Sequence, residues 1–387
     1  MDLRNINEKE IVSGQEDKKI KNQIIKRNYG IDLLRIFSMI NIINLHLNKL
    51  SKLLTFNFNS PKFSSALLLE IFTLNAVDCF GLISGVVGYK RYKFSNLIYL
   101  WIEVSFYSST ISLYLFIKNK LEKKNLILSL FPILIRRHWY INAYFSMYLF
   151  LPFIIYGINS LNRKIYRNLI IFFLLFFSVY NIIANIYGYK DYHFLNNGYS
   201  STWLTILFIL GAYIGKFLII NKKNKNTIYF LICILIYIFC SFLTYEVYFH
   251  LLKTKSTINN KILISYLSPT TVLQALSLIM LSSKFNIKNK YIIKIISFLS
   301  PLTFSAQLIH ARLFREKNIK KMLFVFINKF NYSWLSYKIY GLGIIIYFIC
   351  IFIDYFRLLL FKILKIRNFS ILLENKVPLL IDKLLHN

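Results

Sequence analysis

The sequence predicts an all-α, polytopic membrane protein with about ten transmembrane helices. Of its 387 residues, 56% are hydrophobic and 17% are charged, and the mean hydropathy is +0.51. A soluble domain carries about 25% charged residues and could not bury this much apolar side chain in one core. Apolar runs of about 20 residues, the length that a helix needs to cross a bilayer, recur along the chain. We therefore expect lipid to surround most of it.

The spans expected from this length criterion follow in chain order. They are residues 28–48, 64–89, 94–117, 139–158, 166–187, 201–220, 227–249, 262–282, 291–311 and 334–361. The apolar stretch 126–135 is too short to span and is expected to be interfacial or re-entrant. Residues 1–27 are polar and lack the pattern of a signal peptide, which predicts a cytoplasmic tail. Residues 28–365 then form the transmembrane domain, and residues 366–387 form an amphipathic tail at the membrane surface.

Lysine and arginine residues in alternate loops predict the orientation. They are more numerous on the side that includes both termini, which favours cytoplasmic termini by the positive-inside rule. The loops 118–138 and 312–333 on the other side are also basic, either because they meet something anionic or because the coding sequence is AT-rich and favours lysine. The net charge is +32. Because the cations lie in short breaks between apolar runs, we expect membrane lipid and no nucleic acid as a partner.

The first span carries the most informative residues. Asp32, Arg35 and His46 lie within the otherwise apolar run 31–47. Ionisable groups in a membrane are costly unless they are paired or line a wet cavity, so this run predicts an active-site helix. Asp32 and Arg35 are one turn apart and share a face. At about 1.5 Å per residue, His46 lies on that face ~16 Å beyond Arg35.

These residue types suggest a division of roles along the helix. Histidine is the usual general base near neutral pH, which makes His46 the catalytic candidate. The alternatives are that His46 forms a structural hydrogen bond between helices, or that it simply lies at the outer membrane interface. Arg35 could hold a phosphate of a donor molecule. Asp78, the second buried acid, needs a cationic or histidine partner and could orient His46, as a carboxylate does in hydrolase triads.

Basic residues follow the second span at the predicted cytoplasmic end. Lys90, Arg91 and Lys93 are placed to hold a nucleotide phosphate, although the positive-inside rule alone would also put them there. The four cysteines show no CxxC motif and no Cys/His ligand spacing. We therefore expect neither disulfides nor a metal site.

Aromatic and histidine residues mark the opposite end of the bundle. Trp139, Tyr199 and Trp203 lie where spans begin, and they suit either an aromatic belt or the stacking of sugar rings. His310 ends the ninth span and is either a residue of the acceptor site or an interfacial anchor. These four residues are the candidates for substrate binding.

Several of these motifs together resemble acyltransferase family 3, the membrane acyltransferases that modify bacterial surface polysaccharides. Gln307 stands where many relatives have tyrosine, and Lys90-Arg91-Tyr92-Lys93 stands where many have Arg-x-x-Arg. The resemblance covers roughly residues 27–365 and is carried by the opening motif 27–39 with His46, and by 80–85, 139–152, 198–203 with 211–213, 300–304 and 308–310.

The resemblance implies a ten-helix membrane domain in the bacterial cytoplasmic membrane. It implies acetyl-CoA or another acyl-CoA as the donor substrate, with no permanently bound cofactor, and a hydroxyl of a cell-surface or exported glycan as the acceptor. By the same resemblance, His46 is the catalytic histidine and Arg35 contacts the CoA. Direct transfer and an acyl-histidine relay both fit the residues. The rival functions are a transporter or flippase of an anionic lipid-linked glycan, with the buried charges lining its path, and an assembly scaffold.

Overall fold

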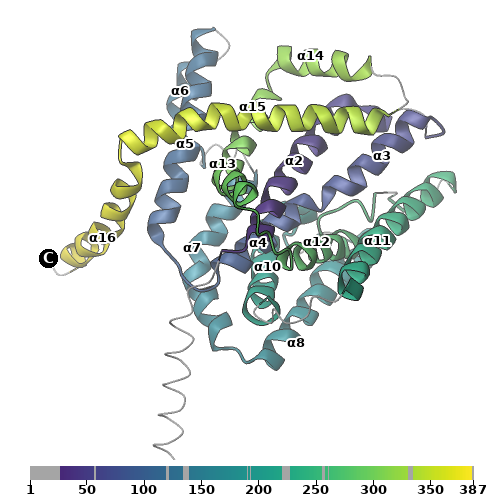
Figure 1. The fold of residues 1–387 in the computed structure, drawn as a ribbon, viewed down its shortest axis with the longest axis horizontal. Coiled ribbons are helices and arrows are strands. Elements are labelled where there is room, and N and C mark those ends of the chain that lie inside the picture. The colour runs from purple at the N-terminus through teal and green to yellow at the C-terminus, as the bar shows by residue number, and fades with distance from the viewer. Residues whose placement is uncertain are drawn as a thin grey trace, which may run out of the picture.

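The computed structural model describes residues 27–55, 58–118, 122–133, 139–189, 191, 193–219, 227–254, 258–259, 261–329 and 334–385. Every regular element within these ranges is a helix, as Figure 1 shows. The longer elements are α2 (Tyr29–Ser51), α3 (Pro61–Leu74), α4 (Ala76–Gly88), α5 (Phe94–Ile117), α6 (Lys123–Leu128), α7 (Trp139–Ser160), α8 (Arg163–Leu174), α9 (Tyr180–Ile186), α10 (Ser201–Tyr213), α11 (Thr227–Lys253), α12 (Pro269–Ser283), α13 (Lys290–Leu313), α14 (Lys317–Asn328), α15 (Leu335–Ile363) and α16 (Ile366–Leu385). The tail predicted at 1–27 lies outside the described residues, apart from Arg27.

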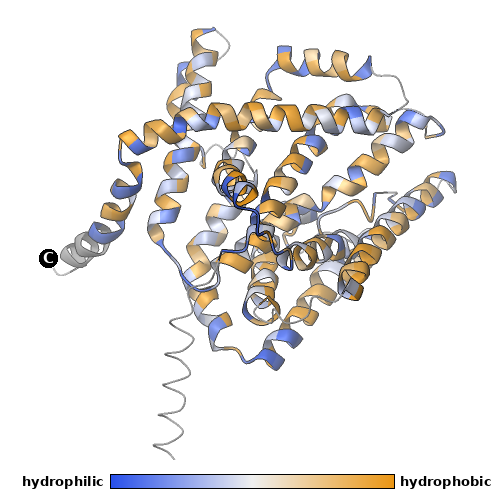
Figure 2. Ribbon diagram, in the orientation of Figure 1, coloured by the Kyte–Doolittle hydropathy of each residue, from blue (hydrophilic) through white to orange (hydrophobic). Residues whose placement is uncertain are grey.

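Nine helical segments in this part of the chain are long and apolar enough to cross a membrane. They are α2, α3 with α4, α5, α7, α8 through α9, α10 with its continuation to Leu218, α11, α13 and α15. Phe153 and Phe352, with exposed fractions of 77% and 65%, are among many large apolar side chains on the outer faces. Figure 2 shows hydrophobic residues along the long helices. Since a soluble protein does not expose this much apolar surface, the prediction of an all-α polytopic membrane protein is confirmed.

Helix α2 runs through the middle of the bundle (Figure 1). It packs against α3, α4, α12, α13, α14 and α15. Asn28 caps its start, because the side-chain oxygen accepts hydrogen bonds from the backbone N–H groups of Gly30 and Ile31. Gly30 allows close packing, since a Cβ at this position would overlap the carbonyl group of Ser282 in α12. Asp32, Arg35 and His46 of α2 are thus enclosed largely by protein rather than lipid.

Helices α4 and α10 approach each other backbone to backbone. A Cβ on Gly85 would overlap the carbonyl group of Phe208, and a Cβ on Gly211 would overlap that of Leu82. Small residues are the usual means of such close packing between membrane helices. The close approach brings α10 against the first turn of α4.

Two predicted spans have different boundaries in the structure. The span expected at 262–282 begins only at Pro269, because proline suits the first turn of a helix and disfavours helical geometry in the residue before it. Residues 261–268 form turns instead. The span expected at 64–89 consists of α3 and α4, which meet at Asn75. Of the stretch 126–135, the first residues belong to α6 and residues 134–138 lie outside the described ranges.

Candidate functional site

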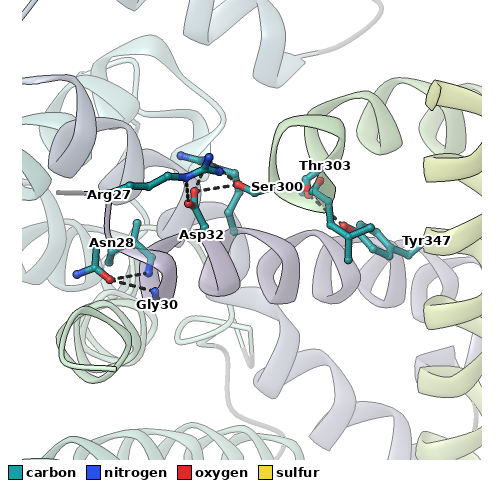
Figure 3. A network of polar contacts seen from close by, with 10 residues as sticks. Arg27, Asn28, Gly30, Asp32, Ser300, Thr303 and Tyr347 are labelled. Atoms are coloured by element: carbon teal, nitrogen blue, oxygen red, sulfur yellow. Dashed lines mark hydrogen bonds and ion pairs between the residues drawn. The ribbon is translucent and has the colours of Figure 1, made fainter. Parts of the chain in front are cut away.

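An ion-pair network lies at the start of α2 (Figure 3). The Asp32 carboxylate accepts a hydrogen bond from Arg27 at 2.6 Å and one from Arg35 at 3.1 Å. Ser300 of α13 donates to Asp32 and accepts from Arg35, both at 2.9 Å. Two guanidinium groups therefore share one carboxylate, and the excess positive charge can attract an anion. The Arg35 side chain remains 25% exposed and is therefore not fully enclosed by the surrounding helices.

The imidazole of His46 lies farther along α2 and forms a hydrogen bond with a second histidine. His46 Nδ1 lies 2.9 Å from Nε2 of His310 in α13. The other ring nitrogen of His310 lies 2.5 Å from the carbonyl oxygen of Ala306, one turn earlier in α13. His310 is fully buried, whereas His46 is partly exposed. The structure thus joins two of the sequence candidates into a pair.

A small cavity of about 30 Å³ opens beside His46. This volume holds about one water molecule. The wall is largely apolar and aromatic, with the imidazole and the Gln307 amide as polar groups. It is formed by Met39, Ile42, Leu45, His46, Val77, Phe80, Trp139, Tyr140, Tyr266, Phe304 and Gln307.

A row of tyrosines leads from the cavity to the middle of α7. Tyr140, Tyr144 and Tyr148 are spaced four residues apart on one face, with neighbouring ring centroids 6.3 and 6.0 Å apart. The row ends at Tyr92, whose ring centroid lies 5.2 Å from that of Tyr148. Arg35 interacts electrostatically with Tyr140 and Tyr144. The row therefore connects the ion-pair network with the cavity.

Comparison with known protein families agrees with this arrangement. The family model of the acyltransferase domain of acyltransferase family 3 matches residues 28–354. The chain belongs to acyltransferase family 3. Searches of curated proteins and of solved structures found no match. Together with the apolar helices, the family assignment makes this protein a multi-pass membrane acyltransferase.

In this acyltransferase the hydrogen-bond partner of Asp78 is Trp203 and not the catalytic candidate His46. The carboxylate is fully buried in the first turn of α4 and accepts a hydrogen bond from the Trp203 indole at 3.2 Å. The hydrogen bond that we expected Asp78 to make with His46 is made by His310 instead. Trp203 has no exposed surface, so its ring does not face a position that a sugar could reach in this conformation.

The basic residues Lys90, Arg91 and Lys93 follow α4 directly. Helix directions place them at the same end of the bundle as Arg35. Lys93 is the N-cap residue of α5, and its carbonyl oxygen accepts a hydrogen bond from Tyr148 at 2.9 Å. The segment is thus attached to the tyrosine row, and its proposed contact with a donor phosphate stays a prediction.

Aromatic residues at the far side of the cavity come from three segments. The Trp139 ring centroid lies 4.5 Å from that of Tyr199 and 6.0 Å from that of Tyr266. Glycine is required at position 198 for two reasons. Its φ is positive, a conformation that glycine adopts easily, and a Cβ at this position would overlap Tyr266. Burial raises the pKa of Tyr266 well above its ordinary value, so its hydroxyl stays protonated. Trp139 lines the cavity and Tyr199 is 41% exposed, so both lie where a substrate could reach them.

Sequence reasoning missed two parts of the site. Tyr266 lies in turns that the sequence suggested were helix, and nothing in the local pattern relates it to Trp139. The four-residue spacing of Tyr140, Tyr144 and Tyr148, in contrast, is visible in the sequence and could have indicated a continuous aromatic face.

Proposed function

We propose that the protein is an integral O-acyltransferase of the bacterial cytoplasmic membrane, with both termini in the cytoplasm. It transfers an acyl group, in the simplest case acetyl, from acyl-CoA to a hydroxyl of a cell-surface or exported glycan. One observation carries the proposal. His46 lines a cavity whose wall includes Tyr140, the first residue of the tyrosine row, and Arg35 interacts electrostatically with Tyr140 and Tyr144 of that row.

The donor is assigned to the end of the bundle that holds Arg35, Lys90, Arg91 and Lys93. Their guanidinium and ammonium groups suit the phosphates of CoA, and Arg27 adds to the positive charge. The flexible arm of CoA would follow the tyrosine row and present its thioester to the cavity. The acceptor enters past Trp139, Tyr199 and Tyr266, whose aromatic faces suit sugar rings.

The reaction then needs one proton acceptor. His46 takes the proton of the glycan hydroxyl while the hydroxyl oxygen attacks the thioester carbonyl carbon. The carbon–sulfur bond breaks, and the CoA thiolate recovers the proton from His46. In an acyl-histidine relay, His46 attacks the thioester carbon first and the carbon–sulfur bond breaks to release the CoA thiolate. The hydroxyl oxygen then attacks the acyl carbon, the nitrogen–carbon bond to His46 breaks, and the thiolate takes the hydroxyl proton. Both routes require an unprotonated ring nitrogen directed at the cavity.

The first test is release of CoA by the purified full-length protein in lipid nanodiscs. The substrates are acetyl-CoA and chemically de-O-acylated surface polysaccharide, and a thiol reagent measures free CoA. We expect acceptor-dependent release in the wild type and release at background level in His46→Ala, with unchanged thermal unfolding. The matched control is His250→Ala, an exposed histidine at the end of α11, which keeps full activity. Full activity in His46→Ala, or transport of the glycan with no CoA release, contradicts the proposal.

A second test separates donor binding from chemistry. Arg35→Gln removes a charged donor of hydrogen bonds and is expected to raise the KM for acetyl-CoA by about tenfold or more, with a smaller effect on kcat. Arg35→Lys keeps the charge and should show an intermediate KM. Arg167→Gln, which removes an exposed arginine of α8, is the control and leaves KM unchanged. An unaltered KM in Arg35→Gln argues against the assignment of the donor site.

A further inference from the structure

The two histidines form a hydrogen-bond chain whose direction is fixed at one end. The Ala306 carbonyl oxygen can only accept, so Nδ1 of His310 must carry the hydrogen. Nε2 of a neutral His310 is then an acceptor, and the hydrogen between the rings belongs to Nδ1 of His46. A neutral His46 therefore carries no hydrogen on Nε2.

We propose that His310 is a positioning residue that holds His46 in the Nδ1–H tautomer, with the lone pair of Nε2 available to the cavity. The proposal rests on the proposed function and deepens it. A general base and an acyl-accepting nucleophile both need that lone pair, so the tautomer serves either route of transfer.

The surroundings of His310 suit a fixed orienting group. The ring is fully buried, and its centroid lies 5.4 Å from that of Phe314 in an edge-on contact. The centroids of His310 and His46 are 5.1 Å apart, and their planes are tilted by 41°. One ring is thus locked by its own helix and in turn sets the rotation of the other.

His310 occupies the place that a carboxylate has in a hydrolase triad. When His46 Nε2 gains the acceptor proton, the positive charge is shared through Nδ1–H with His310 Nε2. The charged residues that act on His46 electrostatically are Lys49 of α2 and Arg315, which follows α13. Both are cations and cannot neutralise an imidazolium. The charged state of His46 is thus short-lived, which favours rapid return of the proton to the CoA thiolate.

Two substitutions of His310 separate hydrogen bonding from packing. His310→Gln can place an amide oxygen near the position of Nε2 and retain the acceptor, whereas His310→Phe fills the space without one. We expect His310→Phe to lower kcat by about 100-fold or more, with little change in the KM for acetyl-CoA. His310→Gln is expected to recover most of the lost rate and to shift the acidic limb of the pH–rate profile. Equal rates in the two variants, with both folded, overturn the proposal.

The tautomer of His46 can be measured by NMR spectroscopy, independently of acyl transfer. The chain has six histidines, so ¹⁵N-histidine labelling gives few signals, and His46→Gln and His310→Gln assign the two of interest. We expect the nitrogen shifts of His46 to report the Nδ1–H tautomer in the wild type and to move toward Nε2–H in His310→Phe. An Nε2–H tautomer in the wild type refutes the proposal. If the tautomer is as expected but no acceptor yields CoA, only the proposed function fails.

Discussion

Gln307 is a polar residue in the wall of the cavity, and one of its side-chain atoms is unpaired in the part of the chain that the structure describes. Its side chain lines the cavity beside His46, and its Oε1 atom is buried with no hydrogen-bond partner among the described residues. A buried polar atom without a partner is costly, which makes Oε1 of Gln307 a candidate for contact with a substrate. In the proposed reaction, the Gln307 amide can accept a hydrogen bond from the acceptor hydroxyl or donate one to the thioester oxygen as negative charge develops there.

Replacing Gln307 with leucine keeps the volume and removes both hydrogen-bonding groups. We expect Gln307→Leu to lower kcat/KM for the glycan by about 10- to 1000-fold while the protein stays folded. Gln307→Glu keeps the shape with a different donor set and serves as the comparison. The measurement is the rate of CoA release at varied acceptor concentration. A kcat/KM in Gln307→Leu equal to the wild-type value would show that the amide touches no reacting group.

At this scale the sequence predicted the residues of α2 better than their partners. Asp32, Arg35 and His46 stand out because charge in an apolar helix is conspicuous and helical spacing fixes their common face. The neighbour of His46 could not be predicted, because His310 is 264 residues away and the choice between it and Asp78 depends on how α13 and α4 pack around α2. The contact of Ser300 with Asp32 and Arg35 could not be predicted for the same reason.

Helix α16 shows how an element at the end of the chain is attached to the bundle. It packs against α5, where the Glu374 carboxylate accepts a hydrogen bond from the backbone N–H of Phe94 at 2.7 Å. Arg367 donates to Asn96 at 2.8 Å. A carboxylate at the start of a helix neutralises free N–H groups and the positive end of the helix dipole. Its place beside the segment 90–93 makes α16 a neighbour of the proposed donor site.

The docking of α16 should depend on pH. Hydrogen bonds from Ser95 and the backbone of Phe94 hold the pKa of Glu374 below its ordinary value. A carboxylate with a lowered pKa stabilises the docked state at neutral pH, and this stabilisation is lost as the pH falls through that lowered pKa. The distance between spin labels at Asn375 and Leu113 should therefore increase as the pH falls below that lowered pKa. In Glu374→Gln this pH dependence should vanish. A distance that varies with pH equally in both proteins would assign the effect to another group.

Across the whole molecule, a buried ionic cluster joins α5, α13 and α15. Arg357 pairs with Asp354 at 2.8 Å and with Glu103 at 3.2 Å. Ser305 of α13 accepts a hydrogen bond from Arg357, and Tyr107 of α5 donates to Asp354. Asp354 and Arg357 are three residues apart within one apolar span, as Asp32 and Arg35 are, although their sequence context suggested no role for them. The third member, on a distant helix, could not be read from the sequence.

Loss of the cation from this cluster should destabilise the fold. Arg357→Met leaves two buried carboxylates without their shared partner, and breaking such a pair typically costs about 3–5 kcal/mol. We expect a clear decrease in the thermal unfolding temperature in nanodiscs. Lys362→Met, which removes an exposed cation from the same helix, should leave it unchanged. Equal unfolding temperatures in the two variants would mean that the cluster contributes little to stability.

The overall architecture could be predicted from hydropathy, because the thickness of the bilayer sets the length of the apolar run that a spanning helix needs. Composition could not predict the late start of α12, where proline chemistry decides the boundary, or the interruption at Asn75. Both departures matter for the site. The first exposes Tyr266 to Trp139, and the second places Asp78 in a first helical turn.

In the proposed reaction, the cavity of about 30 Å³ beside His46 has a kinetic consequence, because the acyl donor is an activated thioester. Water is the competing nucleophile, and a chamber of that size admits about one molecule of it. In the proposed reaction the glycan displaces the aromatic side chains of Trp139 and Tyr266 to reach His46, so its binding also excludes water from the cavity. Hydrolysis of the donor is thereby suppressed before the glycan binds, because only the bound glycan places a nucleophile in position to attack the thioester.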